Sequence, residues 1–133
     1  MTKVNITVVK HGNLEIVSGD GSGCIFVWWI QSKEIIQKCK AHNGAVLDLQ
    51  FDATKIVSCG TDKDIKIIDI ISGDVLQTLR GHDKPVISIA FDNDLILSLS
   101  QDQTLRKWYW SSCSLSQSNS TAMNYIRKSK ERE

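Results

Sequence analysis

The chain has 133 residues, a formal net charge of +1, 41% hydrophobic residues and 23% charged residues. These values are ordinary for one globular domain of modest size, and a charge near zero favours neither nucleic acid nor a membrane surface as a partner. No apolar run approaches the roughly 20 residues that a membrane span requires, so we expect no membrane association.

The chain contains four cysteines, none of them in a C-x-x-C pair: Cys24, Cys39, Cys59 and Cys113. The first residues contain no apolar stretch typical of a secretion signal. We therefore expect reduced thiols in an intracellular protein, cytoplasmic or nuclear, with disulfide pairing as the alternative.

The sequence repeats itself with a period of 40 residues. Three segments align at this spacing: 16–30, 56–70 and 96–110. Three serines share one position of the repeat, Ser18, Ser58 and Ser98, and His42 and His82 lie one period apart. A fixed period of this length indicates an array of one supersecondary unit.

In the first repeat, the sequence GDGSG at 19–23 predicts a β-turn, and IFVWWI at 25–30 predicts a strand. The second repeat is the most complete. It predicts four short strands, at 45–51, 55–59, 64–70 and 75–80. Gly73 lies in the last turn of this repeat, where a positive φ is expected.

The third repeat is weaker towards its end. A fourth strand is expected near 114–119, but SLSQSN has Leu115 as its only apolar residue. Lys107 also replaces the apolar residues Val27 and Ile67 of the earlier repeats. After residue 117 the chain is polar and serine-rich, which predicts a short helix, a mobile tail, or the start of a further segment.

The third strand of the second repeat is apolar on both faces, and IFVWWI at 25–30 in the first repeat behaves in the same way. Side chains alternate along a strand, so Ile65 and Ile67 point to one face while Ile68 and Ile70 point to the other. Such a strand needs cover on both faces. Sheets stacked side by side provide this cover, as in a β-propeller.

These residues resemble the WD-repeat β-propeller family over about residues 4–117. The family places Gly-His before each unit, Ser or Thr on the second strand, Asp in the next turn and Trp-Asp at the end of the third strand. Gly81-His82 matches the first pair, and Asp62 and Asp102 match the turn aspartate. The final dipeptide is eroded in every repeat, to Trp28-Trp29, Ile68-Asp69 and Trp108-Tyr109.

The resemblance implies an all-β fold: three four-stranded antiparallel blades of a β-propeller that form an incomplete ring. Repeat boundaries then follow, with a degenerate repeat at 1–41, a second at 42–81, a third with a weak last strand at 82–117, and a polar, basic tail at 118–133. Three repeats do not close a ring of four to eight blades. The chain is then a fragment or short isoform of a larger propeller, half of a six-bladed homodimer, or an open arc.

The resemblance also implies a structural hydrogen-bond network inside each blade. Its expected members are His42, Ser58 and Asp62 in the second repeat, and His82, Ser98, Asp102 and Trp108 in the third. Buried polar groups of this kind need their partners. Ile68 replaces the tryptophan in the second repeat, so we expect the second blade to be less tightly specified.

Several chemical interpretations are weaker than the structural one. His82, Ser98 and Asp102 have the residue types of a hydrolytic triad, but the set recurs one period earlier and no G-x-S-x-G motif is present. The glycine-rich turn lacks phosphate-loop spacing, and the His and Cys spacings match no zinc site. We expect no catalytic residue, metal or cofactor. Trp29 and Trp110 do not occupy the structural tryptophan position of the repeat. They are therefore expected to lie at a rim, to cover an exposed face, or to stack on a ligand.

The leading functional hypothesis is a non-catalytic scaffold for protein–protein interaction. The resemblance places the commonest binding face at the Gly-His segment and the following turn, here at Asn43, Thr61, Asp83, Lys84 and Gln101. The expected partners are other proteins, a second copy, or another propeller fragment, and nucleic acid is not expected. Alternatives are a substrate-recognition subunit of a ubiquitin ligase and a partial propeller without independent function. An arginine typical of one ligase-docking mode is absent at Gln31, Ile71 and Ser111.

Overall fold

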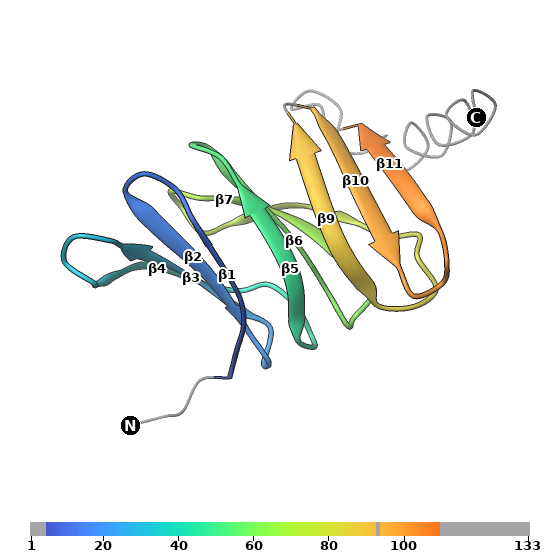
Figure 1. Cartoon of the computed structure of the whole chain (residues 1–133), viewed down its shortest axis with the longest axis horizontal. Coiled ribbons are helices and arrows are strands. Elements are labelled where there is room, and N and C mark those ends of the chain that lie inside the picture. Colours follow the sequence, from blue (N-terminus) through green and yellow to red (C-terminus); the bar gives the residue numbers. More distant parts are fainter. Residues whose placement is uncertain (1–4, 93, 110–133) are drawn as a thin grey trace.

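A computed structural model describes residues 5–92 and 94–109, and within these ranges the chain forms eleven β-strands and no helix. The strands form three antiparallel sheets that lie side by side like the blades of a fan (Figure 1). We call these sheets the first, second and third blades. The all-β fold of an incomplete propeller ring, predicted from the sequence, is confirmed.

Strand order within each blade follows chain order. The first blade contains β1 (Ile6–His11), β2 (Glu15–Asp20), β3 (Cys24–Trp29) and β4 (Ile35–Lys40). The second contains β5 (Val46–Phe51), β6 (Lys55–Gly60), β7 (Ile65–Asp69) and β8 (Val75–Leu79). The third contains β9 (Val86–Asp92), β10 (Leu95–Ser100) and β11 (Leu105–Tyr109). The fourth strand expected near 114–119 and the expected tail lie outside the described residues.

The four strands predicted for the second repeat are confirmed, with each end within one residue of the prediction. Gly73 has the expected positive φ, of 77°. The turn between second and third strands also requires a left-handed residue in every blade: Gly23 (φ 94°), Lys63 (φ 73°) and Gln103 (φ 69°) occupy the same repeat position. The repeat therefore preserves a backbone shape even where the residue is not glycine, at a cost of about 1–2 kcal/mol.

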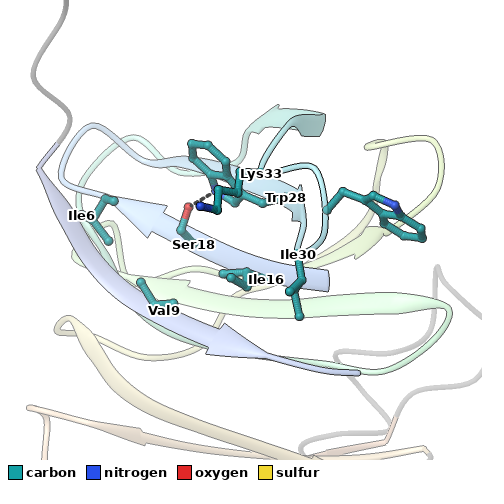
Figure 2. Close-up of a pocket in the computed structure, with 8 residues that line it drawn as sticks. Ile6, Val9, Ile16, Ser18, Trp28, Ile30 and Lys33 are labelled. Atoms are coloured by element: carbon teal, nitrogen blue, oxygen red, sulfur yellow. Dashed lines mark hydrogen bonds between the residues drawn. The ribbon is translucent and has the colours of Figure 1, made fainter. Parts of the chain in front are cut away.

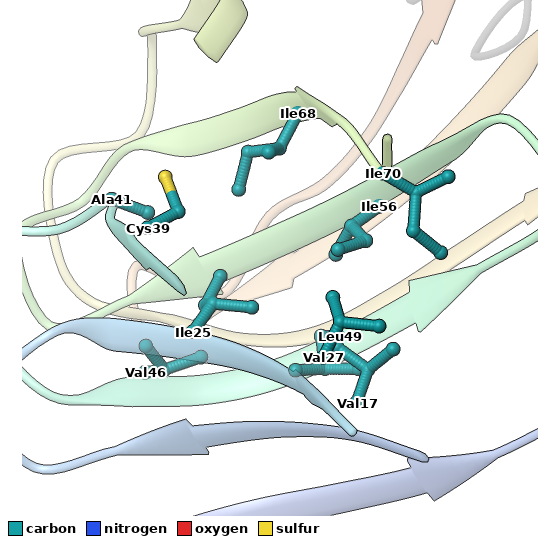
Figure 3. Packing of buried hydrophobic residues seen from close by; sticks show 10 residues of the cluster. All are labelled: Val17, Ile25, Val27, Cys39, Ala41, Val46, Leu49, Ile56, Ile68 and Ile70. Carbon is teal, nitrogen blue, oxygen red and sulfur yellow. The ribbon is translucent and has the colours of Figure 1, made fainter. Parts of the chain in front are cut away.

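Two apolar clusters join the blades, and both faces of β7 contribute. Ile68 and Ile70 belong to the cluster between the first and second blades, which Figure 3 shows. Ile65 and Ile67 belong to the cluster between the second and third blades. The prediction that this strand is covered on both faces is thus confirmed.

The inner strands β1, β5 and β9 lie next to one another and are joined across the blades by hydrogen bonds (Figure 1). The hydroxyl of Thr7 on β1 donates to the carbonyl of Val46 on β5. The N–H of Ile89 on β9 donates to the carboxylate of Asp48 on β5 at 2.9 Å. These bonds fix neighbouring blades to each other at their inner edge, in addition to the apolar packing.

Candidate functional site

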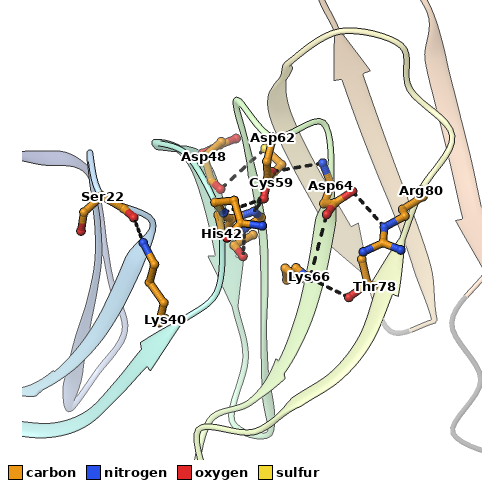
Figure 4. A network of polar contacts seen from close by, with 12 residues as sticks. Ser22, Lys40, His42, Asp48, Cys59, Asp62, Asp64, Lys66, Thr78 and Arg80 are labelled. Carbon is orange, nitrogen blue, oxygen red and sulfur yellow. Dashed lines mark hydrogen bonds and ion pairs between the residues drawn. The ribbon is translucent and has the colours of Figure 1, made fainter.

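The loops at one end of the blades converge on a histidine–aspartate contact. In the second blade, His42 follows β4 and is 1% exposed. Its Nδ1 lies 3.0 and 3.1 Å from the two carboxylate oxygens of Asp62, and its Nε2 lies 2.8 Å from Oγ of Ser58 (Figure 4). A carboxylate only accepts hydrogen bonds, so Nδ1 carries a proton and, in the neutral ring, Nε2 accepts from the serine hydroxyl.

The third blade has the same contact with a tryptophan added. Nδ1 of His82 lies 3.0 Å from Asp102, and Nε2 lies 2.7 Å from Oγ of Ser98. Nε1–H of Trp108 donates to the same serine oxygen at 2.8 Å. The hydroxyl and the N–H of Thr104 both donate to Asp102, the latter at 2.9 Å. The four side chains are therefore joined in one series of hydrogen bonds, from Trp108 through Ser98 and His82 to Asp102.

The first blade has a shorter version of the network. Nε1–H of Trp28 donates to Oγ of Ser18 at 2.9 Å. The position that corresponds to the histidine is residue 2, which lies outside the described residues. Asp20 instead accepts from the N–H and hydroxyl of Ser22 and from the N–H of Cys24, at 2.8 to 2.9 Å. A carboxylate thus closes the turn in this blade as well, from a different position.

Burial sets the charge of these groups. It lowers the pKa of both His42 and His82, and the neighbouring aspartates oppose this only in part. Burial alone would raise the pKa of Asp102, but hydrogen bonds from Thr104 and His82 outweigh it and hold that pKa well below its usual range. Near neutral pH, the histidines of the second and third blades are therefore neutral, and Asp102 beside His82 is a charged carboxylate.

This arrangement is suited to holding loops, not to nucleophilic chemistry. The side chains of Ser58 and Ser98 are 0% exposed, so a substrate cannot reach either hydroxyl. The aspartates instead tie backbone segments together: Asp62 accepts from the N–H of Asn43 at 3.0 Å, and Asp102 accepts from the N–H of Asp83 at 3.1 Å. Each carboxylate thereby joins the loop that enters a blade to a turn inside that blade.

The residues expected to contact partners are all exposed, and they lie at this end of the blades. They are Asn43, Thr61, Asp83, Lys84 and Gln101. The His42–Asp62 contact joins the loop of Asn43 to the turn of Thr61. In the third blade, the N–H of Gln101 donates to the carbonyl of Pro85 at 3.0 Å, which holds the two loops together. We call the exposed ends of these loops the loop face.

Two members of these networks, Asp20 and Thr104, were not predicted from the sequence. The available signal for Asp20 was its place two residues before Ser22, the spacing at which an aspartate caps a turn. Thr104 stands two residues after Asp102, at the same spacing. Trp29 is partly buried beside a hollow on the first blade, and Trp110 lies outside the described residues.

Within residues 5–92 and 94–109, no group of three or more His, Cys, Asp or Glu side chains is arranged to hold a metal ion. Three cysteines in these ranges are free thiols, Cys24, Cys39 and Cys59, and Cys113 lies outside them. The part of the chain that the structure describes also contains no helix long and apolar enough to cross a membrane.

Comparison with known proteins agrees with the fold. The family model of the WD domain, G-beta repeat, matches residues 33–69 and 73–109, more than half of the chain.

Two fungal proteins named ASTRA-associated protein 1 are similar over shorter segments. The one from Penicillium rubens is 46% identical over 55 residues, 38% of this chain and 12% of that protein. The one from Aspergillus flavus is 40% identical over 42 residues, 32% of this chain and 10% of that protein. The match thus spans only about a tenth of these relatives.

Solved structures show the same architecture. The computationally designed Ika4 protein superposes with a TM-score of 0.76 and 28% identity, over 80% of this chain and 66% of that chain. The designed Ika8 protein gives the same TM-score and identity, over 80% of this chain and 34% of that chain.

Proposed function

The chain belongs to the WD-repeat family, and on that premise we propose that it is a non-catalytic scaffold for protein–protein interaction. The observation that carries this proposal is the pair of histidine–aspartate contacts that hold the loop face. In each contact the aspartate also accepts a hydrogen bond from the backbone N–H of an exposed residue, Asn43 in one case and Asp83 in the other, which ties that residue to the blade. Loops held on a rigid frame are where binding residues concentrate in proteins.

The same proposal makes the chain part of a larger propeller, as a fragment or short isoform, inside the cell in the cytoplasm or nucleus. The open ring and the much greater length of the two relatives support it. We retain the division into repeats at 1–41, 42–81 and 82–117 and a tail at 118–133. The binding residues proposed are Asn43, Thr61, Asp83, Lys84 and Gln101.

The names of the two relatives make ASTRA the first partner to test for this chain. Asp83→Lys reverses one charge on the loop face. Asp74→Lys is the matched control, because Asp74 is also exposed but lies in the β7–β8 turn at the opposite end of the second blade. Both substitutions leave the backbone N–H and the buried networks in place.

Tagged wild-type and variant chains are compared for captured proteins by quantitative mass spectrometry, and for thermal unfolding to show that they fold. We expect the Asp83→Lys chain to capture at least tenfold less of a specific partner than the wild type does, and the Asp74→Lys chain to capture as much as the wild type. Equal capture by all three chains would contradict a binding role for the loop face.

A further inference from the structure

The same repeat positions form both interfaces between the blades. These positions also identify the residues on the two outer faces that no described blade covers. We call the side of a blade that packs on the next blade its forward face, and the side that packs on the preceding blade its rear face. The forward face of the first blade contains Val17, Ile25 and Val27. The forward face of the second blade contains their counterparts one period later, Val57, Ile65 and Ile67. The rear face of the second blade contains Val46, Leu49 and Ile56. The rear face of the third blade contains their counterparts, Val86, Ile89 and Ile96.

The 40-residue period identifies the equivalent residues that no described blade covers. On the rear face of the first blade they are Ile6, Val9 and Ile16, and on the forward face of the third blade they are Leu97, Leu105 and Lys107. Exposure changes accordingly. Val9 is 53% exposed, although its counterpart Leu49 is 0% exposed, and Leu105 is 51% exposed, although Ile25 is 1% exposed.

The rear face of the first blade is an apolar hollow of about 500 Å³. Figure 2 shows its aliphatic side chains and the ring of Trp28 around it. The residues that line it include Ile6, Val9, Ile16, Trp28 and Ile30. All five are counterparts of residues that are buried at the interface between the first and second blades: Val46, Leu49, Ile56, Ile68 and Ile70. The hollow is therefore the half of a blade interface that receives the forward face of another blade.

The forward face of the third blade is bulkier than its two counterparts. Leu97 stands where the first blade has Val17, and Leu99, which is 41% exposed, stands where it has Gly19. These larger side chains suit a hollow better than a flat sheet. Lys107 is partly buried on the same face.

A lysine also lies at the interface between the second and third blades. Nζ of Lys55 in the second blade lies 5.0 Å from the ring centroid of Phe91 in the third. The hollow on the first blade presents the ring of Trp28, which offers Lys107 a contact of the same kind, and the cation Lys33 lines the same hollow. The two uncovered faces are thus complementary in their apolar side chains, and Trp28 is the aromatic group available to Lys107.

We propose that these two faces bind each other between two copies of the chain, head to tail, so that the rear face of the first blade in one copy covers the forward face of the third blade in the other. The inference rests on the scaffold role of the proposed function and applies to the chain as a short isoform, for which it names a second copy as the partner of the incomplete ring. Apolar patches of this kind mark association sites. Because the two faces differ, each copy uses both of them, and two copies with three blades each give six blades, a number at which propeller rings close.

The test uses one lysine substitution on each face. Val9→Lys damages the rear face and Leu105→Lys damages the forward face, while the other face of each variant stays intact. Ile71→Lys is the control, because Ile71 is 82% exposed in the β7–β8 turn, away from both faces. Circular dichroism and thermal unfolding check that each variant folds, and Ile6→Lys with Leu99→Lys replaces the pair if one does not.

Light-scattering mass is measured after size-exclusion chromatography at protein concentrations of about 10 to 100 µM. We expect two copies for the wild type and Ile71→Lys, and single copies for Val9→Lys or Leu105→Lys alone. An equimolar mixture of those two variants regains the two-copy mass, because one undamaged rear face meets one undamaged forward face.

Three results would overturn the proposal: a wild type that stays a single copy, a mixture that does not associate, or a Leu105→Lys variant that still pairs, which indicates rear-to-rear contact. The Asp83→Lys variant separates this inference from the proposed function. If its two-copy mass is retained while partner capture is lost, both stand; a single-copy wild type that still captures a partner refutes only the head-to-tail pairing.

Discussion

The distance between the first and second blades can be tested at a single glycine. Gly19 lies in β2 on the forward face, against Val46 of the second blade. A Cβ atom added there would lie 2.6 Å from Cγ1 and 2.7 Å from Cβ of Val46, and 3.1 Å from Cγ1 of Val8. Carbon atoms in contact are ordinarily about 3.5–4.0 Å apart, so the new methyl group overlaps its neighbour by about 1 Å.

We expect Gly19→Ala to lower the free energy of unfolding by about 1–2 kcal/mol. Overpacking of a core costs about 1–3 kcal/mol, and replacing a glycine within a strand by alanine gains about 0.5–1 kcal/mol in chain entropy. Because Cβ of Val46 belongs to the strand itself, a rotamer change cannot relieve the contact. The blades or the strand must move apart.

Urea unfolding followed by tryptophan fluorescence measures this difference, with wild type and variant at the same concentration. Gly21→Ala is the control, since a Cβ atom there would meet only Asn5, at 3.6 and 3.7 Å, and its stability should stay within about 0.5 kcal/mol of the wild type. A Gly19→Ala chain as stable as the wild type would refute the close approach of the two blades.

Three further predictions concern buried groups. Trp108→Phe removes the N–H that donates to Ser98 and should lower the free energy of unfolding by about 1–2 kcal/mol in the same urea assay; no change would argue that this bond contributes nothing. Burial lowers the pKa of His42 and of His82, so the unfolded chain binds more protons below their ordinary pKa, and stability should fall as the pH goes from about 7.5 to about 5.5, by at most about 1.4 kcal/mol for each histidine. A free energy of unfolding that rises on acidification would contradict this sign. Burial raises the pKa of the Cys59 thiol to about 12, so iodoacetamide at about pH 8 should modify it only after unfolding, and mass spectrometry of a native digest that shows rapid modification would refute its burial.

The blade architecture was predictable because the repeat carries two signals at once. The 40-residue period gives the unit, and the apolar residues on both sides of the third strand require neighbours on both sides. Ile65 and Ile68 are three residues apart, and they lie in different clusters as side-chain alternation requires. Strand ends shifted by a residue, since hydrogen bonding and not hydropathy decides where a ladder stops.

Contacts that depend on turn geometry or on the spacing of blades were not predictable. Asp20 and Thr104 cap turns whose shape is known only once the strands are placed. The bond from the N–H of Ile89 to Asp48 depends on how closely two sheets approach, which no single repeat encodes. Lys63 and Gln103 adopt a left-handed backbone that their residue types do not favour, and only their alignment with Gly23 points to it.

The second blade shows why the loss of its tryptophan can be tolerated. Ile68 replaces that tryptophan and removes one N–H donor, a change of about 1 kcal/mol in stability. Ile68 is 0% exposed in the cluster between the first two blades, and full burial of such a side chain contributes about 1.5–3 kcal/mol. All six residues of β6 are buried, because this blade alone among the three described has neighbours on both sides.

We expect the packing of the second blade against a neighbour on each side to outweigh the missing donor, although the sequence predicted that this blade is the less tightly specified one. Hydrogen exchange measured on the second strand of each blade tests this, since β2, β6 and β10 each lie between two paired strands. We expect the amides of β6 to exchange most slowly, because opening them requires separating two apolar interfaces and not one. If the amides of β10 exchange more slowly than those of β6, the tryptophan network of the third blade contributes more to local stability than burial between two blades.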